Sequence, residues 1–238
     1  MSQFSIPCSV YRGGTSRGLM FHKKDLPADA QARNRIFLEG IDAYNASQVN
    51  GLGGTTSSTS KVCVIAPPSV EGVDGDWTFY QVGTGEAVVD DKGTCGNMMA
   101  AVGAFMVDEG LVKVAPNAEK VDVHVYNTNI RKKLLMEIPL IAGKARVSGD
   151  YAMPGILQRG AMARVSIVAP GGEMTGKQLL LGLTTAIATD RKSYTVTFSY
   201  LINPFIFLGE TCFVLGGAES HKYVAANQAV LDKLTLIR

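Results

Sequence analysis

The feature that most restricts the fold of this chain is an uninterrupted apolar run over residues 98–107, which reads Met-Met-Ala-Ala-Val-Gly-Ala-Phe-Met-Val. A helix formed by this run has no polar face, so it must be buried on every side. Asp108, Glu109 and Gly110 then supply the first charges and a suitable helix end. We therefore expect a central helix over about residues 96–111, enclosed by the other elements of the fold.

Strand patterns dominate the rest of the chain. Alternating or continuous apolar segments predict strands, and Gly- and Pro-rich segments separate them. A sheet wrapped around the apolar helix would explain why that helix has no polar face, so we expect an α+β fold. The expected strands cover residues 4–11, 19–21, 61–66, 121–126, 134–138, 161–168, 194–200 and 204–208, with a hairpin of 77–82 and 86–89 and further helices near 25–40 and 223–236.

The length of 238 residues allows one large domain or two small ones. Gly and polar residues gather between Pro139 and Asp150, before a new set of strands. We therefore expect a first domain over residues 1–142 and a second over residues 143–238.

Charge and hydropathy argue against several classes of protein. The formal net charge of +2 is too small to indicate a nucleic-acid partner. No apolar stretch reaches membrane-spanning length without polar interruptions. The segment 1–7 lacks the charged and apolar regions of a secretory signal, so a cytoplasmic location is expected.

The cysteines argue against a metal site. Cys8, Cys63, Cys95 and Cys212 form no CxxC pair, and none has zinc-ligand spacing with a histidine. In a reducing compartment all four should be free thiols. Cys8, Cys63 and Cys212 lie in apolar, β-like surroundings, so we expect them to be buried small side chains. Cys95 differs because Thr and Gly flank it and a helix follows.

Two Gly-rich segments, residues 13–18 and 51–60, are crowded with Thr and Ser. Glycine lets backbone N–H groups approach a ligand closely, and hydroxyls add donors without charge. Together the segments could hold several carboxylates, although a pair of surface turns is the simpler alternative. Neither matches the spacing of a P-loop or of a dinucleotide-binding turn. We therefore expect no nucleotide.

Cys95 and Lys61 are the two reactive side chains at these segments. Cys95 precedes the apolar helix, where free backbone N–H groups and the positive end of the helix dipole face an anion. Lys61 enters a strand directly from the second Gly-rich segment. A solvated strand end and a small residue at a helix start are the structural alternatives. The donor-rich loops beside both residues favour chemistry on a small acid.

Nine segments together carry a resemblance to a known family. They are residues 6–7, 11–18, 25–27, 51–62, 81–82, 93–97, 127–129, 176–177 and 203–205, of which Gly-Leu-Gly-Gly-Thr-Thr-Ser-Ser-Thr-Ser-Lys-Val and Gly-Thr-Cys-Gly-Asn are the most specific. This set resembles the PrpF family, which includes methylaconitate and methylitaconate isomerases, 4-oxalomesaconate tautomerases and aconitate isomerases.

The resemblance implies a diaminopimelate-epimerase-like fold, with a curled, mostly antiparallel sheet around a central helix in each of two similar domains. It implies Lys61 and Cys95 as the catalytic pair, which would move a proton in an unsaturated di- or tricarboxylic acid without a cofactor. One side chain takes the proton and the other returns it, and their order stays open. Substrate contacts are expected from the matching segments, at Arg12, Gly14, Thr15, Ser16, Gly53, Gly54, Thr55, Ser57, Ser60, Gly96 and Asn97.

This chain also departs from the family pattern. Family members are longer, so the chain is expected to stop within its second domain, and Leu181-Gly182-Leu183-Thr184-Thr185 replaces a Leu-Pro-Thr-Gly type of segment. Open edge strands would then favour a homodimer. Two alternatives to an active isomerase follow. One is an amino-acid epimerase or racemase, in which Cys212 is the second cysteine only if it faces Cys95, and the apolar setting of Cys212 argues against this. The other is a non-catalytic remnant that binds a carboxylate or a partner chain.

Overall fold

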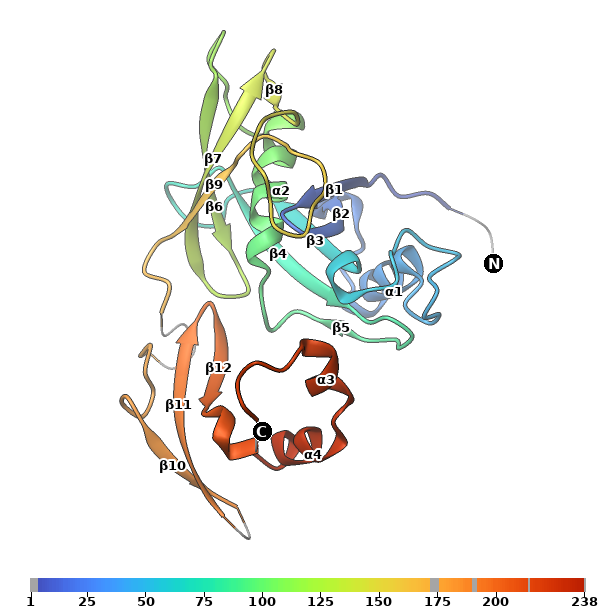
Figure 1. Cartoon of the computed structure of the whole chain (residues 1–238). Helices are drawn as coiled ribbons and strands as arrows, with labels where there is room; N and C mark the ends of the chain where they lie inside the picture. The colour runs from blue at the N-terminus through green and yellow to red at the C-terminus, as the bar shows by residue number, and fades with distance from the viewer. Residues whose placement is uncertain (1–3, 172–175, 190–191, 214, 238) are drawn as a thin grey trace. The chain divides into compact units, whose positions relative to one another are not determined.

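The structure, a computed structural model, describes residues 4–171, 176–189, 192–213 and 215–237 (Figure 1). It contains two compact units, Met1–Ala169 and Pro170–Arg238. The division falls later than the boundary expected between residues 142 and 143, because residues 164–167 pair with a strand of the first unit.

Unit 1 is a nine-stranded sheet curled around one helix (Figure 1). Its strand order is β1-β2-β3-β4-β6-β7-β8, with β5 paired to β4 and β9 paired to β7. Two pairs, β2–β3 and β4–β6, are parallel and the others are antiparallel. The strands are β1 (Ser9–Gly13), β2 (Ser16–His22), β3 (Lys61–Ala66), β4 (Gly75–Val82), β5 (Val89–Asp90), β6 (Lys120–Asn127), β7 (Lys132–Ile141), β8 (Lys144–Ala145) and β9 (Arg164–Ile167).

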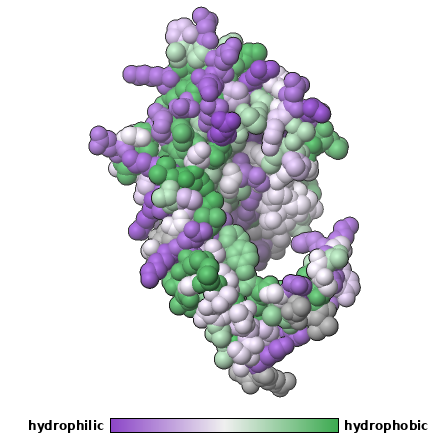
Figure 2. Space-filling view, turned by 60° about the vertical axis from the view of Figure 1, so that its left-hand side comes forward, coloured by the Kyte–Doolittle hydropathy of each residue, from purple (hydrophilic) through white to green (hydrophobic). Residues whose placement is uncertain are grey.

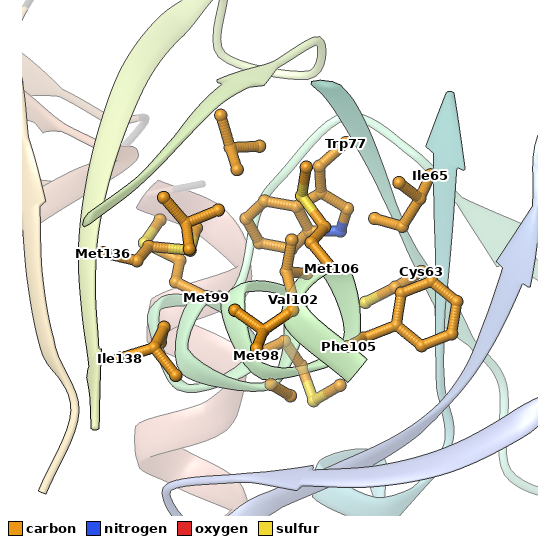
Figure 3. Packing of buried hydrophobic residues seen from close by; sticks show 14 of the residues in the cluster. Cys63, Ile65, Trp77, Met98, Met99, Val102, Phe105, Met106, Met136 and Ile138 are labelled. Atoms are coloured by element: carbon orange, nitrogen blue, oxygen red, sulfur yellow. The ribbon is translucent and has the colours of Figure 1, made fainter. Parts of the chain in front are cut away.

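The apolar run forms α2 (Gly96–Asp108), and the sequence prediction that it is buried is confirmed. Met98, Val102 and Met106 have no exposed surface, and side chains from β3, β4 and β7 surround them (Figure 3). Burying each such side chain contributes about 1.5–3 kcal/mol. The packing of α2 therefore stabilises unit 1, and it fixes where the helix begins.

A second apolar cluster lies on the other side of the sheet. Alternate residues of β2 and β3, such as Leu19 and Val62, contact α1 (Ala30–Ile41) through Phe37 and Ile41. This helix begins five residues after Asp25, the expected start, because the side chain of Asp29 caps it by accepting a hydrogen bond from the Ala32 N–H. The two clusters together bury both faces of the central strands.

Several strand limits differ from the sequence prediction for reasons of pairing. The first strand begins at Ser9 instead of residue 4, because its ladder with β2 ends at Ser9–Met20. The segment 13–18 is mostly strand, since only Gly14 and Thr15 form the turn between β1 and β2. The hairpin after Val82 is present, but its second arm is only Val89–Asp90.

The cysteine predictions are confirmed only in part. Cys63 is buried, as expected. Cys8 is exposed because it lies before the first residue of β1, outside the sheet. Cys212 is partly exposed, in a short turn at Glu210–Phe213.

Unit 2 is smaller and holds a three-stranded antiparallel sheet in the order β10-β11-β12. Its elements are β10 (Thr185–Ala188), β11 (Ser193–Leu201), β12 (Asn203–Leu208), α3 (His221–Ala226) and α4 (Gln228–Ile237). Two helices replace the single helix expected near the C-terminus, because Asn227 has extended backbone and its Oδ1 accepts a hydrogen bond from the Val230 N–H.

The outer face of β6, β7 and β9, which α1 does not cover, is polar. Figure 2 shows hydrophilic side chains projecting from this side of the molecule, and Lys120 and Arg164 form ion pairs with Glu137 across β6, β7 and β9. Across the described residues, none of the helices has the length and apolar character needed to cross a membrane.

Replacing Phe105 by Ala tests the role of the α2 core. Phe105 is 1% exposed and its ring lies 5.6 Å from that of Tyr11. We expect the substitution to lower the free energy of unfolding by about 3–5 kcal/mol, measured by urea denaturation. Leu111→Ala is the control, since Leu111 is 40% exposed, and its change should stay below about 0.5 kcal/mol. Equal losses in the two variants would contradict the assignment of the core.

Candidate active site

Lys61 lies at the start of β3, on the side of the sheet that faces α2. Side chains alternate along a strand. Cys63 and Ile65 belong to the cluster around α2, whereas Val62 and Val64 belong to the cluster around α1. By the same alternation, the side chain of Lys61 lies on the side of the sheet that faces α2. Only 8% of the residue is exposed.

Neutral groups surround the Lys61 ammonium. Its Nζ donates a hydrogen bond of 2.6 Å to Oε1 of Gln81 and lies 5.3 Å from the centre of the Phe79 ring. Among the described residues, no carboxylate oxygen lies within 4.0 Å of this nitrogen. A buried positive charge is costly unless an anion compensates it. The site is therefore suited to receive a carboxylate.

Cys95 occupies the N-cap position of α2 and is partly exposed. Its Sγ lies 3.8 Å from Oγ of Ser16, to which the thiol donates. Nδ2 of Asn97 donates to Oγ1 of Thr15 at 2.9 Å and to Oγ of Ser16 at 3.3 Å. The turn between β1 and β2 is thus tied to the first turn of α2, and the thiol lies at this junction.

Strand pairing brings the two predicted catalytic residues to the same region of unit 1. Gly18 of β2 is the partner of Lys61, and Ser16 precedes Gly18 by two residues, so Ser16 and Lys61 lie on the same side of the sheet. Burial raises the pKa of the Cys63 thiol. The charge of Cys95 raises the pKa of Cys63 further, and the charge of Lys61 lowers it. Cys95 packs against the cluster that contains Cys63, and Lys61 lies two residues before Cys63 on the same side of β3.

The loop over residues 51–60 is held together by a buried glutamine. Oε1 of Gln48 accepts hydrogen bonds from the Thr55 N–H at 2.6 Å and from the Ser60 hydroxyl at 3.2 Å. Gly53 lies against the same Gln48 side chain, and Gly54 lies against Thr59 and Arg17. Two of the expected substrate donors, at Thr55 and Ser60, are thus engaged within the loop, while Ser57 is exposed.

A cavity of about 660 Å³ lies beside α2 and contains another group of the predicted residues. Arg12, Gly14, Gly96 and Asn97 line it, together with residues of the segment 145–165, whereas Lys61 and Cys95 are not among its lining residues. Arg12 donates a 2.8 Å hydrogen bond to the Gly14 carbonyl at its edge. The structure therefore divides the predicted substrate contacts between this cavity, the Cys95 junction and the 51–60 loop.

Sequence reasoning found no role for several polar residues that organise the site. Asn127 has no exposed surface, and its Nδ2 donates to Oγ1 of Thr94, the residue before Cys95, at 2.9 Å. Its Oδ1 accepts from the Ile130 N–H at 3.0 Å. Gln81 and Gln48 act similarly for Lys61 and the 51–60 loop. Gln81 and Asn127 fall in segments that carry the family resemblance, which was the one available signal.

Among the described residues, no group of three or more His, Cys, Asp and Glu side chains is placed to hold a metal ion. The groups at the site are an amine, a thiol, amides and hydroxyls.

Known proteins resemble this chain over nearly its whole length. The model of the PrpF protein family matches residues 3–238. A 3-methylitaconate isomerase from Eubacterium barkeri is 35% identical over 237 residues, which cover 99% of this chain and 62% of that protein. A 2-methyl-aconitate isomerase from Shewanella oneidensis is 35% identical over an alignment 252 positions long, which covers 99% of this chain and 63% of that protein.

Solved structures agree with these relatives. The crystal structure of a methylitaconate-delta-isomerase has a TM-score of 0.76 and 35% identity, with 98% of this chain and 60% of that chain covered. A hydroxyproline epimerase from Agrobacterium vitis has a TM-score of 0.52 at 11% identity, covering 95% of this chain and 58% of that chain, and shares the fold alone. The expected fold class is confirmed. The chain spans about three fifths of the length of these relatives.

Two glycines at the Cys95 junction differ in the space around them, which gives a matched test of its packing. A Cβ at Gly13 would lie 2.1 Å from the backbone oxygen of Asn97, whereas a Cβ at Gly96 meets no atom within 4 Å. We expect Gly13→Ala to destabilise the protein by about 1–3 kcal/mol, measured by thermal unfolding, and Gly96→Ala to change stability by less than about 0.5 kcal/mol. A neutral Gly13→Ala would show that the end of β1 does not pack on α2.

Cysteine alkylation tests the placement of the thiols. Iodoacetamide should label Cys95 and Cys8 in the folded protein, because both have exposed surface. Cys63 should react only after unfolding, because it is buried and its raised pKa keeps it in the unreactive thiol form. Timed labelling followed by peptide mass spectrometry measures the three rates. Labelling of Cys63 as fast as Cys95 would contradict the structure.

Proposed function

The chain belongs to the PrpF family, and from this premise we propose that it is a cofactor-independent isomerase of an unsaturated di- or tricarboxylic acid. The proposed reaction moves a proton between two carbons of the acid, which shifts its double bond or changes the geometry about it. Aconitate and its methylated analogues are the proposed substrate class. The names of the similar isomerases support this class. Those names belong to longer proteins, of which this chain spans about three fifths.

The observation that carries the proposal is the environment of Lys61. Its ammonium is buried next to neutral groups, and Cys95 lies at the same end of the sheet. An acid with several carboxylates supplies the missing negative charge. Its binding would place a carbon next to a carboxylate between an amine and a thiol, the two groups that the reaction requires.

The proposed chemistry balances without an oxidant or a co-reactant. One of the two side chains takes a proton from the allylic carbon, and the C–H electrons move into the conjugated carboxylate to give an enediolate-type anion. The other side chain returns a proton at the far end of the allylic system, and the double bond forms at its new position. Lys61 and Cys95 are proposed for these two roles, in either order. Lys61 carries a positive charge while the anion exists in both orders, because it has either just taken a proton or still has one to give.

The negative charge that builds up on the carboxylate must be stabilised by groups fixed in advance. The cation of Lys61 is one such group. The free N–H groups at the start of α2, including that of Gly96, are another, because they combine unused donors with the positive end of the helix dipole. We propose that Arg12 and Asn97, beside the same helix end, bind a further carboxylate of the acid.

Proton exchange with solvent tests this proposal. In deuterated water, the wild-type protein should introduce deuterium into cis-aconitate, trans-aconitate or a methylated analogue, detected by NMR together with the isomerised product. We expect Cys95→Ala to lower this exchange by at least about a hundredfold. The fold should persist, because the Cys95 side chain makes no capping hydrogen bond to α2. Cys8→Ala is the control, since Cys8 is exposed and lies outside the sheet.

Other outcomes of the same experiment separate the alternative functions. Deuterium at the α-carbon of an amino acid, with none in the unsaturated acids, would instead support an epimerase or racemase. Absence of label from every compound would support a carboxylate-binding protein without catalysis. Full exchange by Cys95→Ala would remove the thiol from the mechanism.

A further inference from the structure

We propose that Gln81 is the positioning residue for Lys61: its amide holds the ammonium with a neutral oxygen and so leaves the positive charge available to a carboxylate of the substrate. This inference rests on the proposed function, since it concerns the same site. Gln81 lies on β4 directly opposite Lys61 in the antiparallel ladder, and its Oε1 accepts the hydrogen bond from Nζ at 2.6 Å.

The orientation of the Gln81 amide is set by backbone groups on its other side. Its Nε2 donates to the carbonyl oxygens of Ser57 at 3.0 Å, Ser60 at 3.0 Å and Val82 at 3.1 Å. A reversed amide would place its oxygen against three carbonyl oxygens and its NH₂ group against the ammonium, so like groups would meet on both sides. Oε1 therefore faces Lys61.

This arrangement links the Gly-rich loop to the reactive amine. Two of the three carbonyls that hold Gln81 belong to the loop before β3, at Ser57 and Ser60. The loop thus determines where the oxygen of Gln81 lies, and that oxygen determines where Nζ of Lys61 lies. A small displacement of a proton-transfer group is costly in rate, so positioning of this kind acts on the chemical step more than on binding.

The choice of an amide over a carboxylate has an electrostatic consequence. A Glu at this place would form an ion pair with Lys61 and cancel the charge that attracts an anionic substrate. Gln supplies the hydrogen bond without the charge. The amide oxygen therefore sets the position of the Lys61 ammonium. Its positive charge stays uncancelled because no acid lies near it among the described residues.

Asn129 provides a matched control for substitutions at Gln81. It is also a partly buried amide attached to β4, with its Oδ1 accepting from the Phe79 N–H at 2.8 Å and its Nδ2 donating to the Phe79 carbonyl at 2.9 Å and the Asp91 carbonyl at 2.7 Å. Its hydrogen bonds involve backbone groups and not Lys61. Removing it should reproduce the loss of stability without the loss of positioning.

NMR of the lysine ammonium groups tests the proposal without substrate. The Lys61 signal in ¹⁵N-labelled protein is assigned by its loss in Lys61→Arg, and the exchange of its protons with water is measured. In Gln81→Met, which keeps the length but not the hydrogen bonds, exchange should be about tenfold faster or more, the effect of losing one hydrogen bond to a charged group. Asn129→Ala should stay within about twofold of wild type.

Two results of the NMR experiment would overturn the proposal. One is a wild-type Lys61 signal that exchanges as fast as those of exposed lysines. The other is an equal acceleration in Asn129→Ala, which would show general loosening of β4. This measurement needs no turnover. It therefore still tests whether Gln81 positions Lys61 if the proposed isomerase activity is not found.

Kinetics with the acid identified by deuterium exchange give a second readout. Gln81→Met should lower kcat by roughly ten- to a hundredfold and leave KM within about threefold of wild type, because it displaces a reacting group. Gln81→Glu should raise KM about tenfold or more, because it cancels the charge of Lys61, whereas Asn129→Asp makes the same chemical change away from Lys61 and should not. A raised KM with unchanged kcat in Gln81→Met would instead place Gln81 in contact with the substrate.

Discussion

Burial of α2 is the constraint on which the arrangement of unit 1 depends. A helix with no polar side chains between residues 98 and 107 must be surrounded, and the sheet curls to do so. Enclosing the helix also fixes its N-terminal end, where Cys95 contacts Ser16 of β2 and Asn97 contacts Thr15 of the preceding turn. The N-terminal end of the helix is thus positioned by the same packing that stabilises unit 1.

A second constraint is the uncompensated charge of Lys61. Protein interiors accept a buried ammonium only where neutral acceptors, a ring face or an external anion offset its desolvation. Gln81 and Phe79 supply the first two. The third would come from a ligand, so the anion preference that we propose for the site follows from the remaining cost of burying this charge. The hydroxyl- and amide-rich loops nearby are consistent with this preference because they add donors without adding negative charge.

The sequence predicted those parts of the structure that local composition decides. The burial of α2 and the limits of β3 follow from apolar runs that leave no other arrangement. The same reasoning placed the start of α1 at Asp25, which was wrong. Asp29 caps the helix instead, and the sequence could not separate them because both residues are plausible caps. The hydrogen bond between Gln81 and Lys61 could not be predicted from the sequence, because it depends on a strand register that pairs two residues 20 positions apart. Contacts set by register are not visible in composition.

Contacts within unit 1 set the positions of Lys61 and Cys95 relative to each other. These positions depend on the pairing of β2 with β3, which sets Lys61 beside Gly18, and on the contact of the α2 N-terminus with Ser16. The placement of unit 2 does not enter either contact. Proton transfer also requires that water be excluded from the developing anion. The two requirements are therefore distinct for the reaction that we propose: contacts within unit 1 position the two side chains, and exclusion of water is a separate condition.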